Sequence, residues 1–130
     1  MIEQTATEVK TWNYLPPSRP IKEDETMPNF VSLELQPKRK DGKKGFISRF
    51  NCRFVLENNT LLEYIAEDSY VIDETDFIDK QELLRMIRNS YTKFNAIFEL
   101  RRLNTVLRNR SMIPLNESAI NLDAILPLLN

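Results

Sequence analysis

The alternation of apolar and polar positions predicts three antiparallel strands in the middle of the chain. From residue 30 to 36 apolar residues occupy every second position, which is typical of a strand with one buried face. Asp41-Gly42 then marks a two-residue hairpin turn, because both positions tolerate a positive φ. The returning strand runs to Leu56, and a tight turn at 57–60 leads into a third strand at 61–72. The pattern therefore predicts a three-stranded meander.

The segment before this meander has two parts. Residues 5–14 are rich in β-branched and aromatic residues and are a candidate fourth strand. Residues 15–28 contain four prolines, which remove backbone donors and exclude a helix or a central strand. We expect a long crossover there, and loops of this length inside a small domain are often functional.

After residue 78 the apolar period becomes helical. Asp79 and Glu82 have the spacing of a helix N-cap and its partner. No Gly or Pro follows until about Arg110, which predicts a helix of roughly 45 Å. Its apolar positions are too many and too widely spread for one small sheet, so we expect a second subunit to cover some of them. The expected interface residues are Phe98, Leu100, Leu103 and Leu107.

The tail, residues 111–129, is unusually apolar for a chain end. It must pack on its own domain, on a second copy or on an apolar segment of another polypeptide. Asn121 or Asp123 is expected to cap a short helix whose buried face is Leu122, Ile125 and Leu126.

Composition narrows the class of protein. At 130 residues the chain is expected to form a single domain, residues 1–130. It has 18 basic and 19 acidic residues, one cysteine and no apolar run that could cross a bilayer, so we expect a soluble cytoplasmic protein without membrane insertion. With no histidine and two glycines, it lacks the commonest general base and a glycine-rich phosphate loop. We expect no enzymatic activity and no cofactor.

The order of these elements resembles the SecB family of bacterial export chaperones. The closest correspondence is in the tail, where Ile113-Pro114 corresponds to a lid loop and residues 121–125 correspond to the start of the last helix. The resemblance implies an α+β fold with a four-stranded antiparallel sheet, a long crossover after the first strand, one long helix and a short C-terminal helix. It also implies a homo-oligomer, dimer or tetramer, that holds unfolded or apolar polypeptide segments without ATP.

By this resemblance, apolar grooves are formed by the crossover, the lid loop and the last helix. Flexible Met and Leu side chains in such grooves suit varied partners. The implied peptide-binding residues are Leu15, Ile21, Met27, Met112, Ile113, Leu115, Leu122, Leu126 and Leu129.

Charge separates this chain from typical SecB proteins, which are strongly acidic and dock the translocase motor through their sheet. The present chain is nearly neutral and carries five basic residues between 38 and 44. A SecB-like fold that serves as an oligomeric adaptor, or that protects an antitoxin partner, is the alternative. We expect no nucleic-acid binding at the basic turn, because basic edge hairpins commonly prevent edge pairing. We expect no metal at the acidic residues near 73–79, which suit a helix start.

Overall fold

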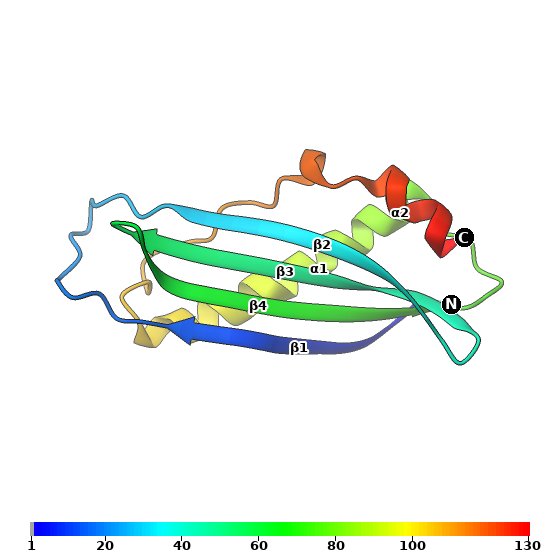
Figure 1. The fold of residues 1–130 in the computed structure, drawn as a ribbon, viewed down its shortest axis with the longest axis horizontal. Coiled ribbons are helices and arrows are strands. Elements are labelled where there is room, and N and C mark those ends of the chain that lie inside the picture. Colours follow the sequence, from blue (N-terminus) through cyan, green and yellow to red (C-terminus); the bar gives the residue numbers. More distant parts are fainter. Residues whose placement is uncertain (1) are drawn as a thin grey trace.

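The computed structural model describes residues 2–130, apart from the side chains of Thr5, Ala6 and Lys40. Four long strands form one antiparallel sheet in the order β1-β4-β3-β2 (Figure 1). The strands are β1 (Ile2–Tyr14), β2 (Asn29–Lys40), β3 (Lys43–Leu56) and β4 (Asn59–Ile72). The predicted meander and the fourth strand are thus confirmed. Both predicted turns have positive φ, 54° and 74° at Asp41-Gly42 and 50° and 66° at Glu57-Asn58.

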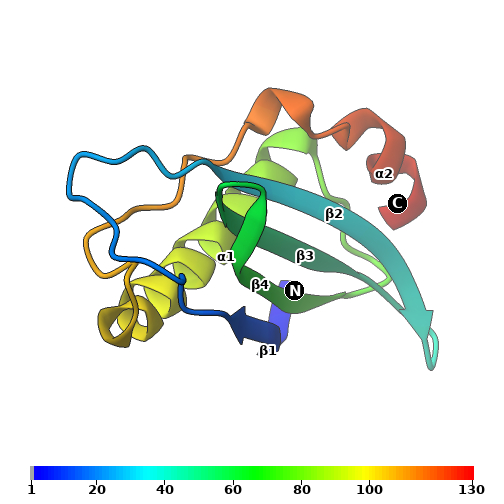
Figure 2. The ribbon, with the colours of Figure 1, turned by 60° about the vertical axis from the view of Figure 1, so that its left-hand side comes forward.

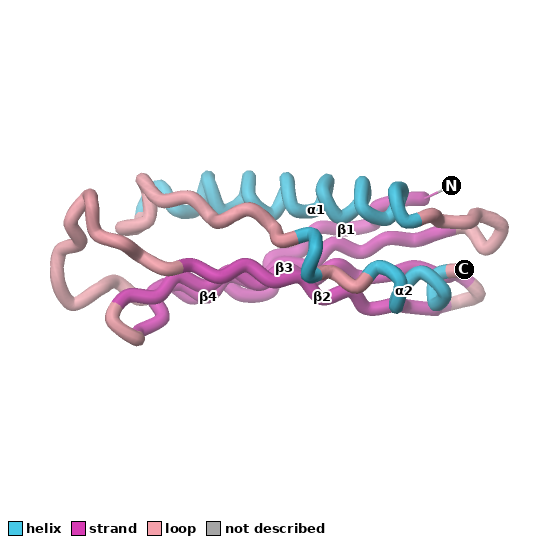
Figure 3. Tube along the Cα trace, turned by 90° about the horizontal axis from the view of Figure 1, so that it is seen from above, coloured by secondary structure: helices cyan, strands magenta, loops and turns pink. Residues whose placement is uncertain are grey.

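The helices lie on one side of the sheet. Helix α1 (Lys80–Arg101) runs along that face, and α2 (Leu122–Leu129) lies beside its N-terminal half, near β2 (Figure 3). Asp79 accepts a 2.7 Å hydrogen bond from the backbone N–H of Glu82, and Asn121 accepts one of 3.3 Å from Ala124. Both predicted caps are therefore present, and the expected α+β architecture is confirmed.

Helix α1 ends at Arg101, about nine residues before the predicted end. The Thr105 hydroxyl donates to the Arg102 carbonyl at 2.8 Å and accepts from the Leu107 N–H at 3.0 Å. Such a local bond competes with the i→i−4 ladder of a helix. The helix is therefore roughly 33 Å long rather than roughly 45 Å, and it has fewer apolar positions for a second subunit to cover than predicted.

Two apolar clusters form the core between the sheet and the helices. One gathers aromatic rings, with Tyr64 and Phe94 stacked at 4.2 Å, and the other contains Phe46, Tyr70 and the first half of α1. Leu129 of α2 is fully buried in the second cluster. The apolar tail thus packs on its own domain.

A row of polar side chains lies between the two clusters. Ser48 on β3 and Asp68 on β4 are direct cross-strand partners, and both are buried, as is Ser90 on α1. The Ser90 hydroxyl bonds to that of Tyr70. Within the described residues, however, neither the Ser48 hydroxyl nor Oδ2 of Asp68 has a hydrogen-bond partner. A buried polar atom without a partner costs about 1–3 kcal/mol.

Replacing Asp68 by valine is therefore expected to raise the free energy of unfolding by about 1–3 kcal/mol, because a buried carboxylate with an unpartnered oxygen, Oδ2, is removed. Urea denaturation measures the change. Glu63→Val, on the opposite face of the same strand, controls for the higher strand propensity of valine. A less stable Asp68→Val protein would show that the carboxylate is paired in the folded chain.

Candidate functional site

The crossover (residues 15–28) lies at one end of the molecule, beside the first part of the segment that follows α1 (the lid segment, residues 102–121), which then runs along the molecule to α2 (Figures 1 and 2). Arg110 joins them, since its guanidinium donates to the carbonyl oxygens of Glu25 at 2.6 Å and Lys22 at 3.1 Å. Asn29, which follows the crossover, accepts a 2.8 Å hydrogen bond from the Ile113 N–H. Two segments more than 80 residues apart therefore form one surface.

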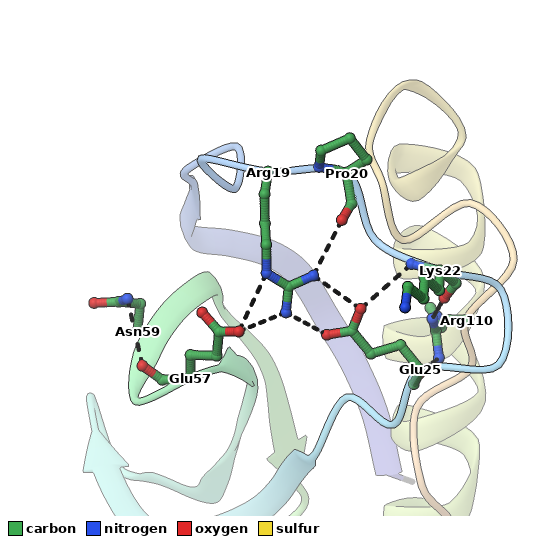
Figure 4. Close-up of polar contacts among 7 residues, drawn as sticks. All are labelled: Arg19, Pro20, Lys22, Glu25, Glu57, Asn59 and Arg110. Carbon is green, nitrogen blue, oxygen red and sulfur yellow. Dashed lines mark hydrogen bonds and ion pairs between the residues drawn. The ribbon is translucent and has the colours of Figure 1, made fainter.

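A second arginine holds the crossover against the turn between β3 and β4 (Figure 4). Arg19 donates to Glu25 at 2.6 and 3.0 Å and to Glu57 at 2.6 and 3.1 Å. Hydrogen bonds from Arg19 lower the pKa of Glu25 from 4.5 to about 2. The contribution of this pair to stability is therefore complete above about pH 4.5, and it is lost as the pH falls towards 2.

Between the crossover and the lid segment lies a cleft of about 700 Å³. Its lining combines apolar, amide and basic side chains. These are Tyr14, Pro16, Ile21, Lys22, Glu23, Asn104, Thr105, Val106, Arg108, Asn109 and Arg110. We call this hollow the crossover cleft.

Two smaller hollows flank α2. The first, about 250 Å³, lies between α2 and β2 and has mostly apolar walls that include Leu33, Ile120 and Leu128. The second, about 440 Å³, lies between α2 and the loop before α1 and contains Phe77 and Leu126. Neither matches the crossover cleft in volume.

The predicted peptide-binding residues fall into three groups by exposure. Met27, Met112, Leu122 and Leu129 are buried in the core. Ile21, Leu115 and Leu126 are half-buried and pack against it. Leu15 and Ile113 are exposed, at 59% and 43%. Of the whole set, Ile21 lines the crossover cleft, and Leu15 directly precedes the lining residue Pro16.

The predicted interface residues also fall into two groups by exposure. Phe98 and Leu107 are fully buried within this chain, so they contribute to its core. Leu100 and Leu103 are exposed, at 72% and 56%, beside the exposed Val106. The part of the predicted interface that is available to a second copy is therefore the end of α1 and the turn that follows it.

The basic turn and the acidic loop lie against each other. The Arg39 guanidinium lies 3.5 Å from the Glu74 carboxylate. The ammonium group of Lys44, a buried residue, donates to the backbone carbonyl of Asp76 at 2.7 Å. The two charge clusters therefore partly neutralise one another. Among residues 2–130, no three His, Cys, Asp or Glu side chains lie close enough together to hold a metal ion.

Two groups with potential reactivity, the Cys52 thiol and the Tyr64 hydroxyl, lie in the core. Cys52 is buried, and burial raises the pKa of its thiol to about 12, which disfavours the nucleophilic thiolate. Burial likewise raises the pKa of Tyr64, whose hydroxyl donates to the Phe94 carbonyl at 2.9 Å. No helix in the described part of the chain is long and apolar enough to cross a membrane.

Sequence patterns missed the polar contacts that shape this surface. Arg19, Asn29 and Arg110 each join segments that are distant along the chain, and no local spacing predicts such pairs. The aromatic residues of 5–14, Tyr14 among them, predict only a strand, yet the Tyr14 hydroxyl accepts a 3.1 Å hydrogen bond from the Val106 N–H and joins β1 to the lid segment.

Replacing Arg19 by glutamine is expected to loosen the crossover without unfolding the protein, because the ion pairs of Arg19 with Glu25 and Glu57 are lost. Hydrogen exchange followed by mass spectrometry should show severalfold faster exchange in residues 15–28, while the denaturation midpoint falls only slightly because exposed ion pairs contribute little to global stability. Arg39→Gln removes an ion pair at the hairpin and should leave the crossover protected. Equal crossover exchange in both variants would contradict the role given to Arg19.

No protein-family model matches the sequence, and no curated protein matches it. Solved structures do share its architecture. One is a protein of unknown function from Streptococcus agalactiae, with a TM-score of 0.53 and 9% identity over 89% of this chain and 97% of that chain. Another is a SecB-like chaperone from Mycobacterium tuberculosis, in complex with a ChAD peptide from the HigA1 antitoxin. It gives a TM-score of 0.50 and 11% identity over 88% of this chain and 83% of that one. The resemblance found in the sequence is therefore confirmed at the level of architecture: this chain has the SecB-like fold.

Proposed function

We propose that the protein is a SecB-like molecular chaperone, an ATP-independent holdase that binds unfolded or partner polypeptides at the surface formed by the crossover and the lid segment. The observation that carries this proposal is the crossover cleft itself. It is the largest hollow described above, and apolar side chains line it or lie exposed beside it. The likeness of the fold to a chaperone that binds a peptide supports the proposal.

The cleft offers an extended polypeptide two kinds of contact. Apolar side chains of the client would be removed from water against Ile21 and Val106, which supplies the driving force. The exposed Leu15, next to the lining residue Pro16, extends the apolar surface beyond the cleft. Client backbone groups would find hydrogen-bond partners in Asn104 and Asn109. Contacts of this kind do not depend on one client sequence, which suits a holdase.

A more specialised role is the second candidate. A SecB-like structure of similar architecture holds a peptide from an antitoxin, and the present chain has a mixed, nearly neutral charge. We therefore also propose a chaperone or adaptor that is dedicated to one partner and works without the translocase motor. A dedicated chaperone would bind one polypeptide far more tightly than a panel of unrelated unfolded proteins.

The proposal places the protein in the cytoplasm as a homo-oligomer, with neither a cofactor nor enzymatic activity. The exposed Leu100 and Leu103 are the candidate contacts between copies. Light scattering on the purified chain, compared with Leu100→Asp/Leu103→Asp, tests the oligomer. A native monomer would contradict that part of the proposal.

Suppression of aggregation tests the holdase function. A chemically denatured client is diluted into buffer without ATP, with the protein at stoichiometric ratio, and turbidity is followed. The native protein is expected to suppress turbidity, whereas Leu15→Asp/Ile113→Asp should lose most of this effect. Phe77→Asp, which changes an exposed apolar residue in the hollow beside α2, is the matched control and should remain active. If the native protein suppresses the aggregation of none of the clients tested, the proposal is overturned.

A further inference from the structure

We infer that the crossover cleft selects extended polypeptide segments in which acidic side chains accompany apolar ones. This inference rests on the proposed function and names the class of client. It follows from the charges that line the cleft and from the way in which neighbouring carboxylates are already used.

The cleft is locally positive although the protein is not. Lys22, Arg108 and Arg110 line it together with one acidic residue, Glu23, so the lining has a net charge of +2. The whole chain has a formal net charge of −1, and the remaining residues therefore carry −3. Positive charge is thus concentrated where the proposed client binds.

These cations are available to a ligand. Within the described residues, Lys22 and Arg108 are exposed and form no ion pair. Arg110 donates to two main-chain carbonyl oxygens, which fix its guanidinium in place but leave its charge unpaired. An arginine with a fixed position loses less entropy when it binds a carboxylate.

The two carboxylates beside the cleft bind mainly to Arg19. Glu25 and Glu57 both point to Arg19, which forms hydrogen bonds with each of them (Figure 4). Glu25 also accepts a 3.3 Å hydrogen bond from the backbone N–H of Lys22, but it forms no ion pair with the Lys22 ammonium group among the described residues. The apolar lining, Pro16, Ile21 and Val106, lies in the same cleft as the three cations. A client with carboxylates among its apolar residues would satisfy both kinds of surface at once, whereas a basic client would meet like charge.

Matched peptides test this selectivity. Three fluorescent peptides share the same apolar residues and carry Glu, Lys or Ser at the positions between them, and fluorescence anisotropy gives their affinities. At low salt the acidic peptide is expected to bind on the order of tenfold more tightly than the basic one. The difference should shrink at 0.3 M salt, because exposed charge pairs are screened.

Charge reversal locates the effect. Lys22→Glu/Arg108→Glu should remove or invert the preference for the acidic peptide. Lys38→Glu/Lys43→Glu changes the net charge equally on the β2–β3 hairpin and should keep the preference. Circular dichroism melting confirms that both variants remain folded.

The outcomes separate the two proposals. If none of the three peptides binds, the proposed function fails, and this inference fails with it. Binding of all three with equal affinity, or tighter binding of the basic peptide, leaves the proposed function in place and overturns the inference. A preference that is lost only in the hairpin variant also overturns it, because the selective surface would then be the hairpin.

Discussion

Replacing Phe98 by alanine is expected to destabilise the fold by about 3–5 kcal/mol. The ring is fully buried, stacks on Phe54 at 5.4 Å and lies 6.3 Å from Trp12. Alanine would remove these contacts and leave a cavity that the sheet cannot fill. Since a domain of this size is stable by about 5–15 kcal/mol, much of its stability would be lost.

Urea denaturation measures this effect against Leu103→Ala as a control. Leu103 is 56% exposed, so its truncation should change the free energy of unfolding by less than about 0.5 kcal/mol. Similar values for the two variants would mean that the Phe98 ring is not in the core. Because Phe98 is buried within this chain, its substitution tests folding, whereas substitutions at the exposed Leu100 and Leu103 test assembly.

Replacing Gly45 by alanine is also expected to cause a large loss of stability. A Cβ at this position would lie 2.0 Å from the backbone oxygen of Tyr70 on the neighbouring strand. Backbone atoms cannot move aside as a side chain can, so β3 and β4 must separate where Phe46 and Tyr70 stack at 4.8 Å. We expect a loss of about 3 kcal/mol, at the upper end of typical overpacking costs.

Gly42→Ala is the matched control for this substitution. Gly42 has a φ of +74° and no atom within 4 Å of an added Cβ, so alanine there meets only backbone strain of about 1–2 kcal/mol. Thermal denaturation of both variants should therefore show the lower midpoint for Gly45→Ala. The reverse order would show that the strands do not approach as closely at Gly45.

Patterns that act over short distances predicted most of the fold. Alternation along β3 and β4 reflects burial of one sheet face, and Asp41-Gly42 takes the positive φ that its turn requires. The predicted helix is too long, because the turn that follows α1, in which the Thr105 hydroxyl bonds to the Arg102 carbonyl, is not visible in the apolar period.

The candidate site was less predictable from sequence. Met27 and Met112 carry flexible side chains of the type that suits a groove lining, but both are buried in the core. Burial depends on how the crossover and the lid segment fold onto the sheet, and Arg110 and Asn29 set that arrangement through contacts over more than 80 residues of chain. The local sequence around Leu15 or Ile113 likewise does not distinguish an exposed leucine or isoleucine from a buried one.

The central claim is that polypeptide clients bind between the crossover and the lid segment. Hydrogen exchange of the full chain, with and without a saturating unfolded client, tests it most directly. Binding is expected to slow amide exchange in residues 15–28 and 102–121 and to leave the strands of the sheet unchanged. Protection confined to other segments, with these two unaffected, would contradict the account.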